Sequence, residues 1–293
     1  MISYDSIQEL VDKAKKKGKF ISELILEDQA MQMEQSQEEL FELMRASLQV
    51  MAEAAAKGLT AVSKSASGLS GGDANKMRQS VDAGRSLSGK VLSETLAKAL
   101  AIAEVNACMG RIVAAPTAGS CGIIPAVLLT LKEENDLPEE RVVMSLFTAA
   151  GLGMVIAKKA SISGAEGGCQ AECGSAAAMA AAAAVELMGG TPQMSAHACA
   201  MALKSVLGLV CDPVAGLVEV PCVKRNASGA ANALIAAEMA LAGIESTIPV
   251  DEVIGAMKAI GDAMPKSLKE TAEGGLADTP TAKKNRPGYF TLT

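Results

Sequence analysis

The chain has 293 residues, which is long enough to bury a sizeable core in one large domain or two small ones. Its 27 basic and 33 acidic residues leave a net charge of −6, and it contains no Trp, two Tyr and four Phe. The acidic balance argues against broad binding to a phosphate backbone, and the few aromatic side chains offer little surface for base stacking, so we expect no nucleic-acid partner.

The amino-terminal part of the chain predicts helices. Ser36 with Glu39 three positions later forms the sequence signature of a capping box. Apolar residues then recur on one helical face: Leu40, Leu43, Met44, Leu48 and Met51. We therefore predict a helical segment over residues 1–60 and a larger domain over residues 61–293. Because no linker marks the boundary, one continuous domain over residues 1–293 is the alternative.

Two uncharged runs have some features of membrane spans. Residues 112–131 are long enough to cross a bilayer, but they contain two prolines and two glycines. This content favours a buried turn that lines a site over a helix exposed to lipid. Residues 142–157 are too short to span comfortably and predict a core helix. We therefore expect a soluble protein without membrane contact.

Other helices are predicted from their start and stop signals. Pro138, Pro192 and Pro249 each stand where a first helical turn could begin. Residues that could cap these turns lie nearby: Asp136, Thr191 and Thr247. Residues 175–188 are almost all alanine and are followed by two glycines, which indicates a strong helix with a defined end.

Little of the sequence favours other structure. Residues 217–223 predict one short strand, and the tail over residues 273–293 predicts an extended or loosely packed end. Alanine and glycine are abundant and permit close approach between helices. The predicted fold class is therefore all-α, a compact Ala/Gly-rich helical domain with ligand-binding loops.

Seven cysteines, with no secretory signal visible at residues 1–5, indicate reduced thiols in the cytoplasm. Cys169, Cys211 and Cys222 each lie in a Gly/Pro-rich turn region. Thiolates on constrained backbone can point at one ion or cluster, and cysteine beside proline is a frequent setting for iron–sulfur ligands. Three protein ligands would leave one position open for substrate, so these cysteines predict a Lewis-acid enzyme.

Spacing alone leaves metal binding and simple packing open for these thiols, because no C-x₂-C pair is present. Cys108 and Cys199 lie within helical patterns and are interpreted as packing residues, whereas Cys121 and Cys173 lie in loops. His197 is the one histidine and is interpreted as a packed or surface residue. A serine–histidine hydrolase or a histidine-ligated zinc enzyme would have to depend on it.

Three glycine-rich stretches cover residues 67–73, 114–122 and 163–168. None matches the P-loop pattern or follows a clear strand, so nucleotide binding is poorly supported. Their amides and hydroxyls would suit a small carboxylate, although helix-connecting turns explain them equally well. The Lys-Arg-Asn run at residues 224–226 adds positive charge after Cys222. It could balance thiolate charge, hold a substrate carboxylate or form surface salt bridges.

Several long motifs in order carry a resemblance to a known family. They are SGLSGGD at 67–73, APTAGSCGIIPA at 115–126, ISGAEGGCQ at 162–170, LVCDPV at 209–214 and VPCVKRN at 220–226. With these motifs the chain resembles the alpha chain of the iron–sulfur L-serine dehydratases, from about residue 65 onward. A series of this length is far more specific than a single glycine loop.

The resemblance implies a 4Fe–4S cluster held by Cys169, Cys211 and Cys222, with one iron open to substrate. Residues 61–293 would then be the catalytic domain, with substrate- and cluster-binding loops. The implied reaction is β-elimination of water from L-serine, which yields pyruvate and ammonia. Residues with hydroxyl groups in the glycine-rich loops are candidates for binding the substrate: Ser67, Ser70, Thr117 and Ser120.

The resemblance also implies a partner, the beta chain of a two-chain enzyme. No catalytic base can be named from this sequence, and we expect the partner to contribute one, because His197 is unpromising. Two alternatives stay open. The first is an iron–sulfur lyase of the L-cysteine desulfidase type, and the second is a non-catalytic helical scaffold whose cysteines only pack.

Overall fold

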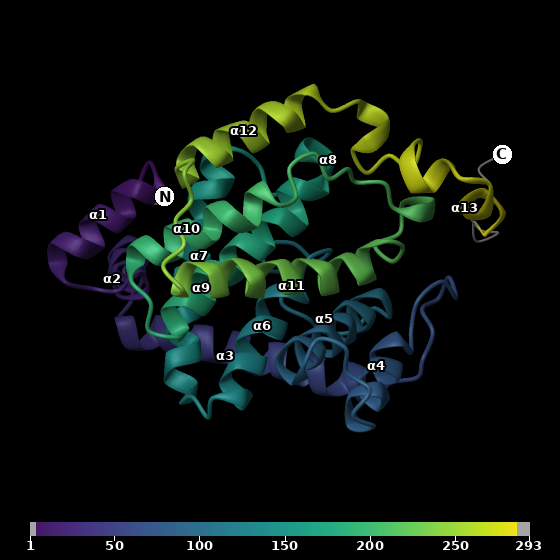
Figure 1. Cartoon of the computed structure of the whole chain (residues 1–293), viewed down its shortest axis with the longest axis horizontal. Helices are drawn as coiled ribbons and strands as arrows, with labels where there is room; N and C mark the ends of the chain where they lie inside the picture. The colour runs from purple at the N-terminus through teal and green to yellow at the C-terminus, as the bar shows by residue number, and fades with distance from the viewer. Residues whose placement is uncertain (1–3, 286–293) are drawn as a thin grey trace.

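The computed structural model of the chain describes residues 4–285. In this range every regular element is helical, apart from an isolated parallel bridge between Cys211 and Lys269 (Figure 1). The predicted all-α fold class is therefore confirmed. The α-helices are α1 Ile7–Lys17, α2 Ile21–Met33, α3 Gln37–Thr60, α4 Asp73–Asp82, α5 Lys90–Ala107, α6 Ile123–Glu134, α7 Glu139–Lys159, α8 Gly164–Gly167, α9 Ser175–Leu187, α10 Pro192–Lys204, α11 Cys222–Leu241, α12 Val250–Ala263 and α13 Pro280–Lys284. Shorter helical turns are the π-helical turn Gln170–Gly174 and the 3₁₀ turns Val214–Gly216, Lys266–Leu268 and Gly275–Asp278.

Helix α9 forms the centre of the hydrophobic core. All of its 13 residues are buried, and eight of them are alanine. These small side chains let α6, α7, α10 and α11 pack closely around it. The helix ends before Gly189, whose φ of 85° suits the left-handed position after a helix C-cap. The predicted alanine helix and its stop are therefore confirmed.

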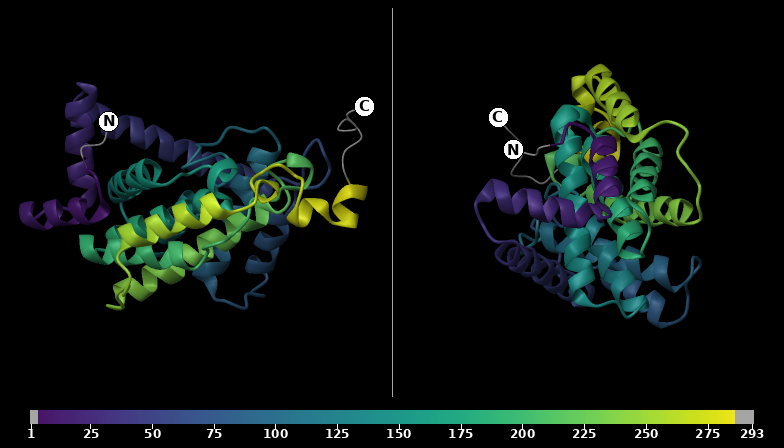
Figure 2. Two further views of the ribbon diagram at one scale, coloured as in Figure 1. Left: turned by 90° about the horizontal axis from the view of Figure 1, so that it is seen from above. Right: turned by 90° about the vertical axis from the view of Figure 1, so that its left-hand side faces the viewer.

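The amino-terminal helices pack on this core. Helices α1 and α2 lie at one end of the molecule and α13 lies at the other (Figure 2). Helix α2 packs on α7, and α3 packs on α5. The carboxylate of Asp251, on α12, accepts the amide N–H groups of Ile7 and Gln8 at 2.9 and 3.0 Å, which anchors the start of α1. The domain boundary at residue 60 stays a sequence prediction.

The predicted helix starts are partly confirmed. Ser36 and Glu39 form the capping box at α3, and Thr191 caps α10 through its side chain. At α7 and α12 the prolines themselves, Pro138 and Pro249, occupy the N-cap position. The predicted caps at these two helices, Asp136 and Thr247, are therefore wrong. The fixed φ of proline suits the backbone of an N-cap, and its side chain has no hydrogen-bond acceptor, so no side-chain cap is made there.

The predicted strand over residues 217–223 is wrong. This part of the chain turns back on itself, because the Val214 amide donates to the Val220 carbonyl at 2.8 Å. Pro221 has no N–H to donate to a strand ladder, and α11 begins at the next residue. The segment is therefore a compact turn that delivers Cys222 to the start of a helix.

The carboxy-terminal tail is better ordered than predicted as far as it is described. Residues 275–278 and 280–284 form short helices, and Ala277 is fully buried. The amide of Leu276 donates to the carboxylate of Asp212 at 2.7 Å, which ties the tail to the core. Asp212 lies 64 positions before Leu276 in the sequence, so the composition of the tail could not indicate this contact. Residues 286–293 lie outside the described part of the chain.

The two uncharged runs are both largely internal. Residues 120–131 are buried, with irregular backbone up to the start of α6 at Ile123. Among the described helices, α7 alone is long and apolar enough to span a membrane, and 67% of its most apolar window is buried inside the protein. The prediction of a core helix over residues 142–157 is therefore confirmed.

The buried carboxylate of Glu186, on α9, makes the stability of this fold depend on pH. It accepts the amide N–H of Ile21 at 3.1 Å, at the start of α2. Burial raises the pKa of Glu186 above its ordinary 4.5, although hydrogen bonds from the Ile21 and Ser22 amides act in the opposite direction. The folded state therefore holds this proton at pH values where the unfolded chain has lost it. Unfolding free energy falls as pH rises from about 4.5 through the raised pKa.

Glu186→Gln should reduce that fall, because glutamine keeps an acceptor oxygen and cannot ionise. We expect the variant to lose less unfolding free energy than the wild type between pH 4.5 and 7, measured by urea denaturation at several pH values. The exposed Glu245→Gln serves as control and should keep the wild-type slope. Identical slopes for Glu186→Gln and the wild type would contradict this role of Glu186.

Candidate metal centre

Four segments converge at the end of the core near the start of α11. They are the turn before α6, the π-helical turn, the loop after α10 and the first turn of α11. Asn226, which is 1% exposed, donates its amide to the carbonyls of Gly119 and Cys222 at 2.7 and 2.9 Å. It also accepts the Gly122 amide at 2.8 Å. One buried side chain on α11 therefore fixes the turn before α6 against the segment that carries Cys222.

The three cysteines singled out by sequence are all buried at this junction. Cys169, Cys211 and Cys222 are 1%, 2% and 6% exposed. Backbone hydrogen bonds hold Cys211 on both sides, since its amide donates to Leu268 at 2.8 Å and its carbonyl accepts from Glu270 at 2.7 Å. Contrary to the sequence interpretation, Cys222 lies on a helix, as the first residue of α11. A helix N-terminus favours a thiolate.

The three thiols influence one another electrostatically. Burial raises the pKa of Cys222 to about 12 and also raises that of Cys211, and the nearby charge of Cys169 raises both further. By contrast, a hydrogen bond from the Cys173 thiol lowers the pKa of Cys169, and the charge of Arg225 acts in the same direction. The structure therefore brings the three predicted ligands into one electrostatic group. Binding of a metal would have to displace protons from Cys211 and Cys222.

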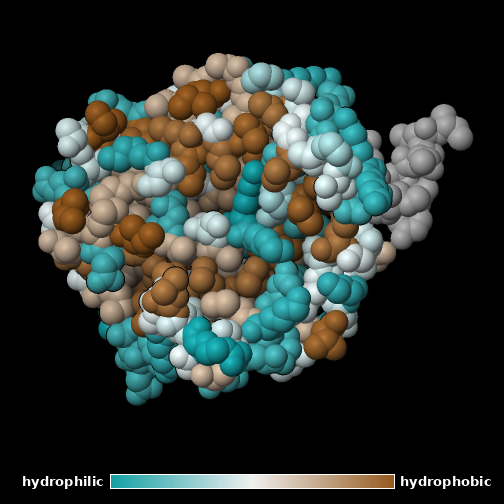
Figure 3. All heavy atoms as spheres, turned by 45° about the vertical axis from the view of Figure 1, so that its right-hand side comes forward, coloured by the Kyte–Doolittle hydropathy of each residue, from teal (hydrophilic) through white to brown (hydrophobic). Residues whose placement is uncertain are grey.

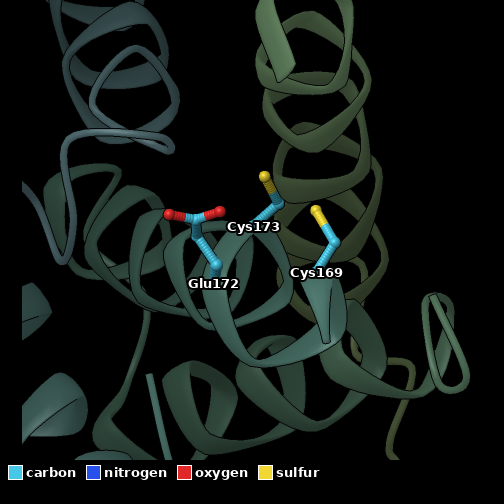
Figure 4. Close-up of side chains that lie close together, drawn as sticks. All are labelled: Cys169, Glu172 and Cys173. Atoms are coloured by element: carbon cyan, nitrogen blue, oxygen red, sulfur yellow. The ribbon is translucent and has the colours of Figure 1, made fainter. Parts of the chain in front are cut away.

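A tighter group of potential ligands surrounds Cys169 itself. Among the described residues, Cys169, Glu172 and Cys173 offer ligand atoms that all lie within 4.8 Å of one another. Figure 4 shows them on one side of the widened π-helical turn, with both sulfur atoms and the carboxylate facing the same space. Sequence reasoning missed Glu172 and placed Cys173 in a loop. The signal available was the spacing of three and four positions from Cys169, which brings side chains together only on a helix.

Arg225 is the cation of this centre. Its guanidinium donates to the carboxylate of Asp212 and to the carbonyl of Val210, each at 2.9 Å. Burial opposes its charge, but Cys169, Asp212 and Cys222 together raise the pKa of Arg225. Lys224 points elsewhere and makes an exposed salt bridge with Asp73 at 2.9 Å. Three roles were considered for the Lys-Arg-Asn sequence at residues 224–226. Lys224 forms a surface salt bridge, and Arg225 lies where its charge can balance that of the thiolates.

Two of the predicted substrate-binding residues lie beside the cysteine group. The Thr117 hydroxyl donates to Glu172 at 2.5 Å and lies 2.9 Å from the hydroxyl of Ser120, which is fully buried. Gly119 makes this approach possible, because a Cβ there would lie 2.5 Å from the Glu172 carboxylate. Burial raises the pKa of Glu172, against the effect of the Thr117 hydrogen bond. The loop before α6 is therefore attached to the π-helical turn.

The other two predicted residues, Ser67 and Ser70, belong to a second loop. The Ser67 hydroxyl lies 2.8 Å from both carboxylate oxygens of Glu219. Ser70 is buried, and its backbone is held by Ser65, whose own hydroxyl donates to Glu219 at 2.6 Å. The structure thus places the four predicted residues in two pairs, one attached to Glu172 and the other to Glu219.

The remaining candidates take structural positions. Cys199 is fully buried in α10, Cys121 is buried before α6, and Cys108 is exposed at the C-cap of α5. Burial raises the pKa of Cys121 to about 12. The ring of His197 accepts the amide N–H of Ser246 at 3.2 Å, as expected for a packed histidine.

Comparisons with known proteins agree over almost the whole chain. The family model described as serine dehydratase alpha chain matches residues 16–277. The chain is 53% identical over 287 residues to a Bacillus subtilis protein named "Probable L-serine dehydratase, alpha chain", with 98% of this chain and 95% of that protein covered. It is 44% identical to "L-serine dehydratase, alpha chain" from Peptoniphilus asaccharolyticus, with 98% of both covered. It is 40% identical to "L-serine dehydratase" from Streptomyces coelicolor, with 92% of this chain but 59% of that protein covered. The chain belongs to the serine dehydratase alpha chain family.

Proposed function

We propose that this protein is the alpha chain of an L-serine dehydratase, a lyase that converts L-serine to pyruvate and ammonia. The observation that carries the proposal is the 53% identity to an alpha chain of that name across nearly the full length of both proteins. The buried cysteines and the hydroxyl-bearing loops at one end of the core give the proposal a physical site.

We infer that Cys169, Cys211 and Cys222 hold a 4Fe–4S cluster. Iron–sulfur clusters are held mainly by thiolates, and these residues supply three from separate segments of the chain. Cys211 and Cys222 lie outside the compact group around Cys169, and a cluster of several irons holds its thiolates farther apart than a single ion does. The compact group with Glu172 and Cys173 would suit one ion better. The guanidinium of Arg225 supports the fit, because it would offset part of the thiolate charge.

When bound, such a cluster would supply Lewis acidity, which favours loss of the β-hydroxyl group of serine. The chain's own residues would bind and orient the amino acid. Thr117, beside the cysteine group, offers a hydroxyl at the loop before α6, and Ser67 offers one at the loop before α4. Ser70 and Ser120 are buried and are hydrogen-bonded within these loops, Ser70 to Ser65 and Ser120 to Thr117. Loss of the α-proton and of water gives aminoacrylate, which becomes an imine and hydrolyses to pyruvate and ammonia.

We propose that a beta chain completes the enzyme in the cytoplasm and supplies the catalytic base. The Streptomyces coelicolor relative, which this chain covers to 59%, contains a large part without counterpart here. His197 is engaged by the Ser246 amide, so it does not offer a free base.

Hydrophobic residues lie exposed among hydrophilic ones on the face shown in Figure 3. Large exposed apolar side chains in the chain include Val62, Leu87 and Met109.

The proposal is tested by anaerobic co-expression of this chain with a candidate beta chain, followed by assays of iron, sulfide and pyruvate. We expect bound iron and pyruvate formation from L-serine. Faster pyruvate and sulfide formation from L-cysteine would favour a desulfidase instead. A colourless, iron-free and inactive protein would favour the scaffold reading. Restoration of activity to metal-free protein by pyridoxal phosphate would contradict the iron-dependent reaction.

A further inference from the structure

A groove of about 500 Å³ lies between the two hydroxyl-bearing loops. Its walls are mostly small or apolar: Ala66, Ala107, Met109, Ala118, Leu217 and Val218. The charged residue that lines it is Glu219, which is 7% exposed. Such a volume admits a small amino acid, and apolar walls strengthen any charge interaction made inside.

Glu219 is a buried carboxylate without a positively charged partner in the part of the chain that the structure describes. The hydroxyls of Ser65 and Ser67 hold it at 2.6 and 2.8 Å. The two cations that follow it in the sequence are engaged elsewhere, Lys224 with Asp73 and Arg225 with Asp212. Hydroxyl groups satisfy the hydrogen-bonding capacity of a carboxylate but do not neutralise its charge.

Acidic groups outweigh basic ones in the electrostatic surroundings of Cys108, beside the groove. Burial, Glu104 and Glu219 together raise the pKa of the neighbouring Cys108, and the charge of Lys57 opposes them more weakly. The Glu104 carboxylate is turned away from the groove, because it accepts the amide N–H groups of Gly72, Asp73 and Ala74 at the start of α4. A small cation that enters the groove would therefore find Glu219 as its partner.

Two walls of the groove are connected to the cysteine group through neighbouring residues. Ala118 on one wall follows Thr117, which is bonded to Glu172 beside Cys169. Glu219 on the other wall lies three residues before Cys222, and its carbonyl accepts the Val223 amide at 2.9 Å. A ligand in the groove would thus lie between a loop bonded to the turn that follows Cys169 and the segment that leads to Cys222.

We propose that Glu219, held in place by Ser65 and Ser67, binds the α-ammonium group of the amino-acid substrate. This assignment rests on the proposed function and names the group that recognises the amine. An ammonium group supplies the charge and the donors that the buried carboxylate lacks. Ser67 was predicted from sequence to bind the substrate directly. In this proposal it acts indirectly, because its hydroxyl orients Glu219, the residue that contacts the substrate.

The test compares two ligands of the assembled wild-type enzyme and its Glu219→Gln variant. L-serine carries the ammonium group, whereas 3-hydroxypropanoate, used as a competitive inhibitor, lacks it. We expect the KM for L-serine to rise roughly 10- to 100-fold in the variant, the range for loss of a hydrogen bond to a charged group. The inhibition constant of 3-hydroxypropanoate should change little. Glu238→Gln, at an exposed position of α11, is the matched control and should change neither value.

Thermal unfolding separates substrate binding from a purely structural role. Removing a buried charge without a counter-charge should leave the unfolding temperature of the ligand-free enzyme unchanged or higher. A lower unfolding temperature, with parallel rises in KM and in the inhibition constant, would overturn the assignment and leave Glu219 as a loop anchor.

Titration with potassium chloride tests an inorganic cation as the occupant. If saturating potassium restored the KM of Glu219→Gln to the wild-type value, the site would bind a metal cation and the ammonium assignment would be wrong. A wild-type assembly that does not act on L-serine would instead reject the proposed function. An active wild type with an unchanged KM in Glu219→Gln would reject only the ammonium site.

Discussion

Cys211→Ser is expected to abolish both iron binding and serine turnover in the assembled enzyme. A serine hydroxyl is a poor ligand for an iron–sulfur cluster, and the loop that carries Cys211 is fixed by backbone bonds to Leu268 and Glu270. No other thiol can therefore take its place without rearrangement of the loop. We expect activity to fall by more than about 100-fold, together with loss of the brown colour, measured as iron and sulfide per chain and pyruvate formation from L-serine.

Two other cysteines make the assignment falsifiable. Cys199→Ser, in the fully buried interior of α10, should keep the cluster. Cys173→Ser should also retain iron, because Cys173 is a neighbour of Cys169 and not one of the three proposed ligands. Loss of iron in Cys173→Ser but not in Cys211→Ser would assign the metal to the compact group with Glu172. Equal loss in Cys199→Ser and Cys211→Ser would mean that the ligands are wrongly assigned.

Arg225→Ala should destabilise the protein by about 3–5 kcal/mol, the range for removal of one partner from a buried ion pair. The side chains of Arg225 and Asp212 are 16% and 4% exposed, so the variant leaves a buried carboxylate without its cation. It also removes the hydrogen bond to the Val210 carbonyl, which helps to hold the loop before Cys211. Urea denaturation of the assembled enzyme measures the change in unfolding free energy.

The preceding residue provides the control. Lys224 is 72% exposed and pairs with Asp73 on the surface, so Lys224→Ala should cost less than about 1 kcal/mol. Similar losses for the two alanine variants would contradict the view that Arg225 is part of the buried centre. A stable Arg225→Ala protein that still binds iron normally would contradict it as well.

Local signals predicted those parts of the fold that depend on local energetics. The capping box at Ser36 and the alanine helix α9 follow from side-chain and backbone preferences within a few residues. The predicted strand at residues 217–223 failed because Pro221 and the start of α11 shape that turn. The order of the tail depends on Asp212, far away in the sequence. Distant contacts of this kind are invisible to a reading of local composition.

For the site, as for the fold, sequence predicted some residues but not the contacts between distant segments. Motif context singled out Cys169, Cys211 and Cys222, and the structure places all three at one buried junction. Their partners could not be predicted, because Glu219 reaches Ser67 across 152 sequence positions and Thr117 reaches Glu172 across 55. Both pairs form only when loops from separate helices meet. Sequence therefore indicated the ligand types, whereas the fold was needed to show what surrounds them.

The dependence of serine turnover on the iron–sulfur cluster is tested most directly by removing iron from the assembled enzyme and then restoring it under anaerobic conditions. We expect the rate of pyruvate formation to fall in proportion to bound iron and to recover when iron and sulfide are returned. An undiminished rate in protein from which all iron has been removed would contradict this dependence.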